Sequence, residues 1–318
     1  MAGNMGDMGD MGDMGDIAAG HGGGGVWPDR VDLPFVVVTD PQGGVRISDT
    51  CFGHDGSYER HWSIEWRATA LLAEFTDTDA WRNRAPRSGD GSAEAAANGL
   101  ALTPWTQKRA SLDADLKARV RKEIKELVIA AETERADAVS EIISQHMTFV
   151  PHLMALLDAS PASHPKTYLL INSAVLIAGF AGQHFKQISQ RRRPGQVCPA
   201  LNPPIPVPGH AAYPSGHSTQ AHLCALSLTR AFGGTPALPE TGLPGPAPDP
   251  ELATRLQVDA APALRAMAWR LARNREIAGV HYRSDTLGGR ELAEKLFVAL
   301  AGMPGYVQLL RDVNDEWA

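Results

Sequence analysis

The sequence predicts a mainly α-helical domain with an irregular N-terminal extension. The clearest sign is an apolar residue at every fourth position from Leu112 to Val128, which is the spacing of one face of an amphipathic helix. A second sign is the apolar stretch 168–182, which we interpret as a buried helix. A hydrophobic content of 43% gives such helices enough apolar surface to form a core.

The chain begins with a segment of low complexity, residues 1–25. Met-Gly-Asp occurs four times in succession between Met5 and Asp16, and a run of glycines follows, so the segment has little apolar surface to bury. We expect it to be a disordered tail. It lacks the basic region and apolar run of a secretory signal. We therefore expect a cytoplasmic protein with one folded domain, residues 26–318.

An N-terminal arm is expected over residues 26–110. Residues 34–47 suggest a small hairpin around an Asp-Pro-Gln-Gly-Gly turn. Residues 63–75 have a helical pattern, whereas segment 85–103, rich in Ala, Gly, Ser and Asn, is typical of a linker. The arm is thus expected to add little regular structure to the helical core that follows, residues 111–318.

The helical core is predicted to consist of several helices and one insertion. The apolar stripe continues to Met147, which predicts one amphipathic core helix or two, ended by Pro151. Segment 233–252 contains six prolines and is expected to be an irregular surface insertion, because proline suits neither a helix nor a central strand. The other helices are predicted over residues 152–157, 167–185, 216–232, 261–278 and 286–300.

Charge and composition argue against several classes of protein. The net charge of −6 is spread over segments of mixed sign, which leaves no basic face for nucleic acid. The apolar stretch of 15 residues is shorter than the roughly 20 residues that span a bilayer, so no membrane span is expected. Three cysteines with neither a CxxC pair nor a dense pattern favour a reduced compartment. The oligomeric state is not predicted by any of these features.

Three short clusters of cationic, small and acidic residues follow one another in the core. The sequence Pro-Ser-Gly-His is expected by chance at only about one in 10⁵ positions. The ordered combination of all three clusters therefore indicates a functional site. The first cluster is Lys186 with Arg193 and Pro194, the second is Pro214, Ser215, Gly216 and His217, and the third is Arg275, His281 and Asp285.

The first residues of these clusters suit the binding of an anion. Phosphoryl transfer spreads negative charge over three oxygens, which fixed donors or metal ions must stabilise. Lys186, Arg193 and Arg275 supply positive charge without a metal, so no metal site is expected. Ser215 after a proline is a good N-cap, which directs the amides and the positive end of the following helix towards an anion. Gly216 lets that anion approach the backbone closely.

Two histidines remain for the bond-making steps. His281 and Asp285 are four residues apart, so they can touch on one helical face. The carboxylate would fix the imidazole tautomer and leave the other nitrogen to attack phosphorus. His217, beside the anion donors, is suited to protonate the departing oxygen. Arg275 does not share a helical face with His281, and Gly279 is the expected break between them.

These clusters resemble the signature of the superfamily that joins type 2 phosphatidic acid phosphatases, class A bacterial acid phosphatases and vanadium haloperoxidases. The resemblance covers residues 186–285. It implies a helical bundle in which His281 is the phosphohistidine nucleophile or the vanadate ligand, His217 the acid-base and Asp285 the partner of His281. Asn274 stands where the family often has serine, a departure that concerns only a secondary contact.

The sequence favours the phosphatase branch and leaves the haloperoxidase branch open. The chain lacks the several membrane spans of the lipid phosphatases and the signal peptide of the secreted acid phosphatases, and its clusters are closely spaced. We expect a phosphatase for small phosphomonoesters that needs no cofactor. The alternative is a haloperoxidase that binds vanadate and uses peroxide and halide, and a third class is a binding protein without turnover. His210 lies five residues before Ser215, as in bromoperoxidases, so a pocket role and a packing role are both open for it.

The other basic and aromatic residues near the clusters are expected to be structural. A single residue of these types is more often exposed or packed than catalytic. Arg191 and Arg192 extend a basic run that we expect on a solvated face. His184, Tyr213 and His222 are expected to pack in the core.

Overall fold

The computed structural model describes residues 62–84, 100–106, 115–234, 236, 238 and 260–318. These residues form helices and connecting segments, with no β-strand among them, so the predicted mainly α-helical fold is confirmed. The predicted tail 1–25, the hairpin at 34–47, most of the linker 85–103 and most of the insertion 233–252 lie outside the described residues.

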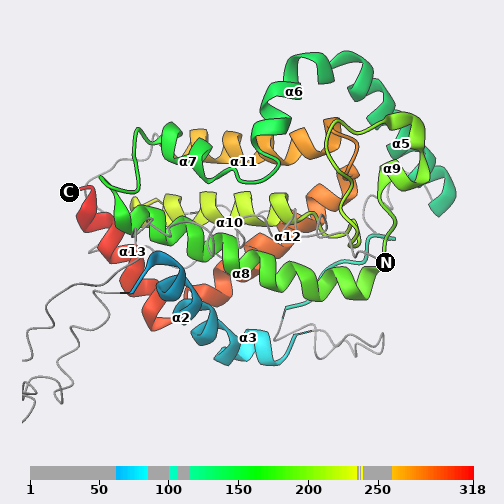
Figure 1. Ribbon diagram of the computed structural model, residues 1–318. Coiled ribbons are helices and arrows are strands. Elements are labelled where there is room, and N and C mark those ends of the chain that lie inside the picture. The colour runs from blue at the N-terminus through cyan, green and yellow to red at the C-terminus, as the bar shows by residue number, and fades with distance from the viewer. Residues whose placement is uncertain (1–61, 85–99, 107–114, 235, 237, 239–259) are drawn as a thin grey trace, which may run out of the picture.

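The helices follow one another in a bundle with smaller helices attached to it (Figure 1). Proline occupies the first turn of four of them, α7, α8, α9 and α13, where its missing N–H leaves no hydrogen bond unmade. The helices are α2 (Ile64–Asp77), α3 (Asp79–Arg82), α5 (Leu116–Thr133), α6 (Arg135–Ser144), α7 (Val150–Leu156), α8 (Pro165–Ser189), α9 (Pro194–Val197), α10 (Gly216–Ala231), α11 (Ala260–Ile277), α12 (Arg283–Leu300) and α13 (Pro304–Glu316), with a 3₁₀ turn at Pro199–Leu201.

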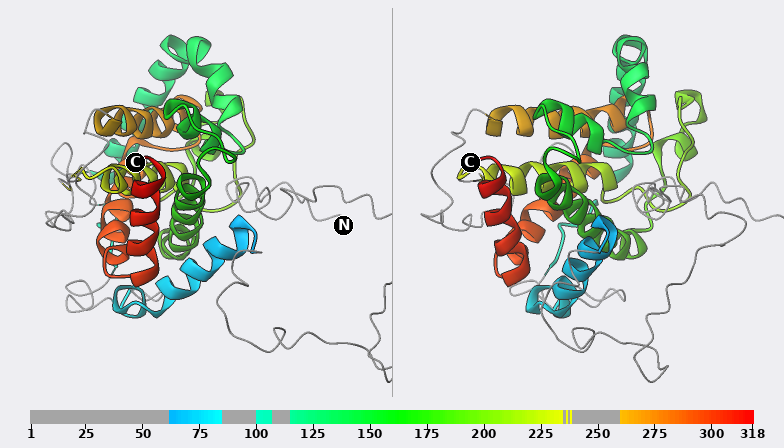
Figure 2. Two further views of the ribbon diagram at one scale, coloured as in Figure 1. Left: turned by 90° about the vertical axis from the view of Figure 1, so that its left-hand side faces the viewer. Right: turned by 60° about the vertical axis from the view of Figure 1, so that its left-hand side comes forward.

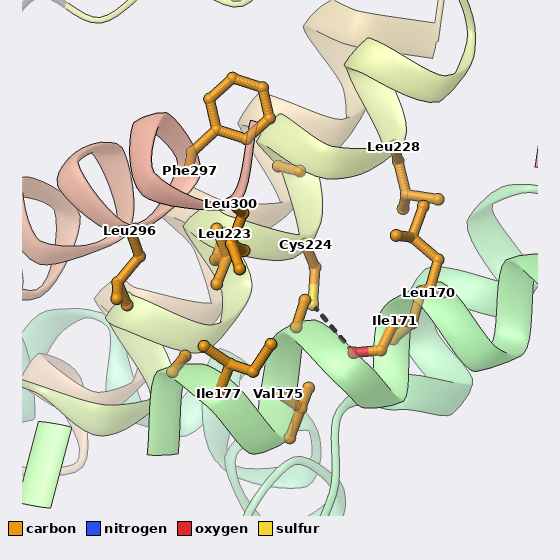
Figure 3. Close-up of a cluster of buried hydrophobic side chains, with 14 of the residues drawn as sticks. Leu170, Ile171, Val175, Ile177, Leu223, Cys224, Leu228, Leu296, Phe297 and Leu300 are labelled. Carbon is orange, nitrogen blue, oxygen red and sulfur yellow. Dashed lines mark hydrogen bonds between the residues drawn. The ribbon is translucent and has the colours of Figure 1, made fainter. Parts of the chain in front are cut away.

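Helix α10 is the centre of the bundle. Every residue of α10 except Gly216 and Leu226 is buried, because α8, α11 and α12 surround it (Figure 1). The C-terminal ends of α8 and α11 and the N-terminal ends of α10 and α12 lie at the same end of the bundle (Figure 1). The apolar core between the helices includes Leu170, Ile171, Val175, Ile177, Leu223, Cys224, Leu228, Leu296, Phe297 and Leu300 (Figure 3).

Helices α5 and α6 differ from the predicted core helix. The predicted stripe is divided at Glu134 into two helices that project from the bundle, as Figure 2 shows from two sides. The predicted alternative of two amphipathic helices is thus confirmed, but their buried residues Leu127, Ala130 and Ile142 belong to two smaller apolar clusters rather than to the main one, and Ile143 of the predicted stripe is 55% exposed. Pro151 does not end this helix, since α6 ends at Ser144 and Pro151 belongs to the first turn of α7.

Helix α13 was not predicted from the sequence. Its buried residues Tyr306, Leu309, Leu310 and Val313 are spaced i, i+3, i+4 and i+7, a pattern that would have identified it. It packs against α8 and α10 at the end of the bundle opposite to the start of α10 (Figure 1). The helix therefore completes the core at the end of the bundle away from the three sequence clusters.

Helix α8 is longer than the predicted helix and strongly apolar. By length and composition the stretch Pro165–Val197 could cross a membrane, and it alone meets that criterion among the described residues. In its most apolar window, 78% of the residues are buried inside the protein. Core helices of folded domains have the same composition, because they are surrounded by other helices on most sides.

Two adjacent glycines in α12 allow the start of α10 to pack closely. A Cβ atom at Gly288 would overlap the ring of Tyr213. A Cβ atom at Gly289 would lie 2.6 Å from the carbonyl oxygen of Ser215 and 2.8 Å from the Cβ of Ser218. The glycine pair thus fixes how near the second sequence cluster lies to α12.

Replacing Gly289 with alanine should destabilise the protein by about 1–3 kcal/mol, the usual cost of overpacking a core. Gly182→Ala is the matched control, because Gly182 is also buried within a helix but nothing lies within 4 Å of its added Cβ. This control should be neutral or stabilising by about 0.5–1 kcal/mol. Denaturant unfolding measures both, and a Gly289→Ala protein as stable as the wild type would contradict the close packing.

Candidate functional site

The three sequence clusters come together at one end of the bundle. Lys186 lies near the C-terminus of α8 and Arg193 follows that helix, whereas Ser215, Gly216 and His217 begin α10. Arg275 lies near the C-terminus of α11, His281 in the connection to α12 and Asp285 in the first turn of α12. All of these residues except Gly216 are buried. Charged groups that are buried away from water each require a specific hydrogen-bond or ion-pair partner.

His281 is held between a carboxylate and a guanidinium. Its Nδ1 lies 3.3 Å from Oδ2 of Asp285, and its Nε2 lies 3.1 Å from NH1 of Arg193. A guanidinium can only donate, so Nε2 must be the acceptor and Nδ1 must carry the proton. Burial and the charge of Arg193 lower the pKa of His281 to about 3 and outweigh the opposing effect of Asp285. His281 is therefore neutral, with its lone pair at Nε2.

The predicted contact between His281 and Asp285 is present, but it is not made on one helical face. His281 precedes α12, which begins at Arg283, and α11 ends at Ile277. Gly279 has φ +79° and lies in the break, where it was expected. Asp285 reaches back over the start of α12 and also accepts a hydrogen bond from the backbone N–H of Tyr282 at 2.9 Å.

Asp285 is ionised and has three donors. Besides Tyr282 N–H and His281 Nδ1, NH1 of Arg191 donates to its Oδ1 at 2.6 Å. Burial alone would raise the pKa of Asp285, but Arg191, His281 and the backbone donor lower it to about 2. The carboxylate thus stays charged and keeps the proton of His281 on Nδ1.

Arg193 connects the nucleophile candidate with the segment before Ser215. It is fully buried, its Nε donates to the carbonyl of His210 at 3.0 Å, and its NH2 lies 3.1 Å from Nδ1 of the His210 ring. NH1 also donates to the carbonyl of Val280 at 3.2 Å. His210, for which two roles were open, therefore contacts the site through Arg193.

The start of α10 has the predicted capping geometry. Ser215 is the N-cap, and its Oγ accepts a hydrogen bond from Ser218 N at 3.4 Å. The N–H of Ser215 donates to the carbonyl of Asp285 at 3.1 Å, which joins the second cluster to the third. Nε2 of His217 donates to the carbonyl of Gln145 at 3.0 Å, so a neutral His217 has its lone pair at Nδ1. The two histidines are thus held in opposite tautomers.

Lys186 and Arg275 are anchored to main-chain carbonyls. Nζ of Lys186 donates to the carbonyl of Ala211 at 2.9 Å, and NH2 of Arg275 donates to the carbonyl of Ile142 at 2.8 Å. The carbonyl of Arg275 in turn accepts from the N–H of His281 at 3.3 Å. Arg275 therefore links the third cluster to α6, while Lys186 links α8 to the segment before α10.

Two residues of the site were not identified from the sequence. Arg191 is buried rather than solvated, because its NH1 is bonded to Asp285 and Ser284 and its NH2 donates to Oε2 of Glu123 at 2.9 Å. Arg192 is exposed, as expected. Glu123 also accepts from Ser284 N at 2.8 Å. Glu123 shares the buried face of α5 with Leu127 and Ala130, and a carboxylate in line with apolar residues is the signal that would have revealed it.

The other candidates are packing residues, as expected. The ring of His184 contacts Trp81 at a centroid distance of 5.6 Å, and that of His222 contacts Trp269 at 4.8 Å. The hydroxyl of Tyr213 donates to the carbonyl of Thr103 at 2.5 Å. None of these contacts involves the residues that hold His281.

A pocket of about 680 Å³ adjoins the site. Lys186, Arg191 and His210 form part of its wall, whereas His217 and His281 do not. Arg193 lies between the two regions, because it is bonded both to His210 and to His281. Neither Arg193 nor His281 lines the pocket: both are buried behind His210 of its wall.

Removing the carboxylate of Glu123 should strongly destabilise the protein. Glu123→Ala leaves the buried Arg191 with one carboxylate fewer, and breaking a buried ion pair in this way costs about 3–5 kcal/mol. Glu132→Ala, on the exposed side of the same helix, is the control and should change stability by no more than about 0.5 kcal/mol. Equal unfolding midpoints for the two variants would show that the ion pair contributes little.

The two histidines of the candidate site should give different NMR signatures. ¹⁵N chemical shifts should show a protonated Nδ1 in His281 and a protonated Nε2 in neutral His217, because their partners fix opposite tautomers. Since the pKa of His281 is lowered to about 3, its resonances should not titrate between pH 8 and pH 5. A titration of His281 near pH 6.5, the ordinary histidine value, would contradict the buried neutral ring.

No family model matches this chain, and no curated protein matches its sequence at a significant level.

Proposed function

We propose that this chain is a metal-independent phosphatase that hydrolyses phosphomonoesters through a phosphohistidine on His281. The observation that carries the proposal is the line of contacts Asp285, His281 and Arg193. It presents a neutral imidazole with its lone pair at Nε2 next to a fully buried cation. The order of the three clusters and the helical bundle agree with the superfamily that the sequence resembles.

In the proposed first step, Nε2 of His281 attacks the phosphorus atom. The new N–P bond forms as the P–O bond of the ester breaks, and the imidazolium that results is stabilised by Asp285 through Nδ1–H. The substrate must replace Arg193 in its contact with Nε2. The guanidinium is then next to the phosphoryl oxygens, where planar paired donors suit the developing charge.

His217 is the proposed acid and base. Its ring is fixed by Nε2–H on the carbonyl of Gln145, so Nδ1 is the nitrogen that exchanges protons. A protonated Nδ1 gives its proton to the departing alkoxide, and neutral Nδ1 then takes a proton from the water that attacks the phosphohistidine. This second step releases inorganic phosphate and restores both histidines.

A vanadium-dependent haloperoxidase is the second candidate. The contact between His210 and Arg193 favours it, because the sequence argument for this branch rested on His210. The same cationic donors fit a vanadate ion, with His281 as its protein ligand. Bound vanadate supplies activation of hydrogen peroxide for halide oxidation. Phosphate and vanadate share their geometry at an in-line centre, so assays must separate the two activities.

The decisive experiment compares His281→Ala with His217→Ala on substrates with different leaving groups. His281→Ala should abolish phosphate release from every ester, since it removes the covalent step. His217→Ala should lower turnover of an alkyl phosphate by about 10²–10⁴-fold but retain much of the turnover of a nitrophenyl phosphate, whose anion leaves without a proton. His164→Ala, in which the lost ring stacks on Trp317, serves as a control with full activity.

The assays should be run in excess EDTA and repeated with vanadate, peroxide and halide. Phosphate release in EDTA and an acid-labile phosphate on His281 would support the proposal. Loss of activity in EDTA that a divalent ion restores would overturn the metal-independent mechanism. Halide oxidation without phosphate release would favour the haloperoxidase, and neither activity would favour a binding protein.

A further inference from the structure

The side chains that line the pocket beside the site are mostly amides and cations. Gln183, Lys186 and Gln187 line it from one face of α8, at positions i, i+3 and i+4, and Gln190, the C-cap of this helix, adds a further amide. Gln196 adds a further amide from α9. Among the described residues, no carboxylate, no Phe, Tyr or Trp and no aliphatic side chain larger than alanine lines the pocket. Its surface therefore consists of amides, cations, the His210 imidazole, backbone and the methylene groups of long polar side chains.

The α8 glutamines nearest Lys186 have hydrogen-bonding capacity to spare. The side chains of Gln183 and Gln187 make no hydrogen bond with the described part of the chain. Each primary amide offers two donors and one acceptor oxygen, and an alcohol group needs both kinds of partner. Two such amides one turn apart on a helix provide a row of sites for neighbouring hydroxyl groups.

We propose that this pocket holds the alcohol part of the substrate, and that the preferred substrates are phosphate esters of sugars or polyols. This inference rests on the proposed phosphatase function. The phosphate would enter on the His210 side, where it displaces the buried Arg193 from Nε2 of His281, because Arg193 joins His210 of the pocket wall to His281. The alcohol part then extends along the glutamines of α8.

The size and charge of the pocket fit this class of substrate. A volume of about 680 Å³ is within the range of small-ligand pockets and accommodates a hexose phosphate. No carboxylate in the wall repels the phosphate as it enters. A lipid phosphate would need an apolar wall, and a nucleotide would gain from an aromatic or apolar surface for its base. In the part of the chain that the structure describes, the wall offers no large apolar side chain, and its one ring is the His210 imidazole, which Arg193 contacts.

The test compares kcat/KM for glucose 6-phosphate with that for hexyl phosphate, which has a similar chain length but no hydroxyl groups. The wild type should prefer glucose 6-phosphate by about tenfold or more, because the alkyl chain leaves the wall amides unpaired. The double variant Gln183→Leu with Gln187→Leu should lose most of this preference. Gln308→Leu, an exposed glutamine on α13, is the matched control and should keep it. Circular dichroism checks that all variants are folded.

The outcomes separate this inference from the proposed function. Turnover of both esters with equal kcat/KM, or a preference for hexyl phosphate, would overturn the substrate class and leave the phosphatase intact. A preference that the double variant retains would overturn the role of the glutamines. If no ester is turned over, the phosphatase proposal fails. Calorimetry then tests the pocket alone: tighter binding of glucose 6-phosphate than of inorganic phosphate supports it, and equal binding refutes it.

Discussion

The buried charge of Asp285 is the constraint on which the rest of the site depends. An ionised carboxylate away from water costs several kcal/mol unless donors surround it. Arg191 supplies one donor from the segment after α8, and the neighbouring His281 and Tyr282 supply the other two from the connection before α12. Satisfying one charge therefore fixes the segment after α8, the first turn of α12 and the orientation of the imidazole. Arg191 also pairs with Glu123 on α5, so one guanidinium serves two buried carboxylates.

The same network sets how the folded protein responds to acid. Unfolded histidine takes up a proton near pH 6.5, whereas folded His281 stays neutral down to about pH 3, so the folded state loses stability as the pH falls through this window. Asp285 contributes stability that is complete above its ordinary pKa and is lost as the pH falls towards about 2. Near neutral pH both groups are in the states that the proposed chemistry requires.

The sequence predicted the parts of the site that depend on local patterns. The ordered clusters identified His217, His281 and Asp285, and local spacing predicted the cap at Ser215 and the break at Gly279. Helices α8, α10, α11 and α12 were also predicted, because their apolar residues follow the helical period, whereas α13 was missed although it has the same spacing. Glu123 and Arg191 were missed because a charged residue is expected on the surface. Only the folded structure shows that these two, 68 residues apart in sequence, form a buried ion pair. The sequence pattern of α5 and α6 shows that they are amphipathic but not that they pack on two smaller apolar clusters outside the main core, because that depends on which distant segments meet them.

The hydrogen bond from His217 to Gln145 places part of the candidate site outside the motif. The carbonyl of Gln145, which orients this imidazole, lies just after α6. Glu123, which forms an ion pair with Arg191, lies on α5. Both helices precede residues 186–285, the only stretch that the family resemblance covers. A homologue could therefore keep every motif residue, lack this helical pair and still be counted as an intact enzyme. In searches for relatives, a carboxylate at the position of Glu123 would separate complete sites from those that keep only the signature.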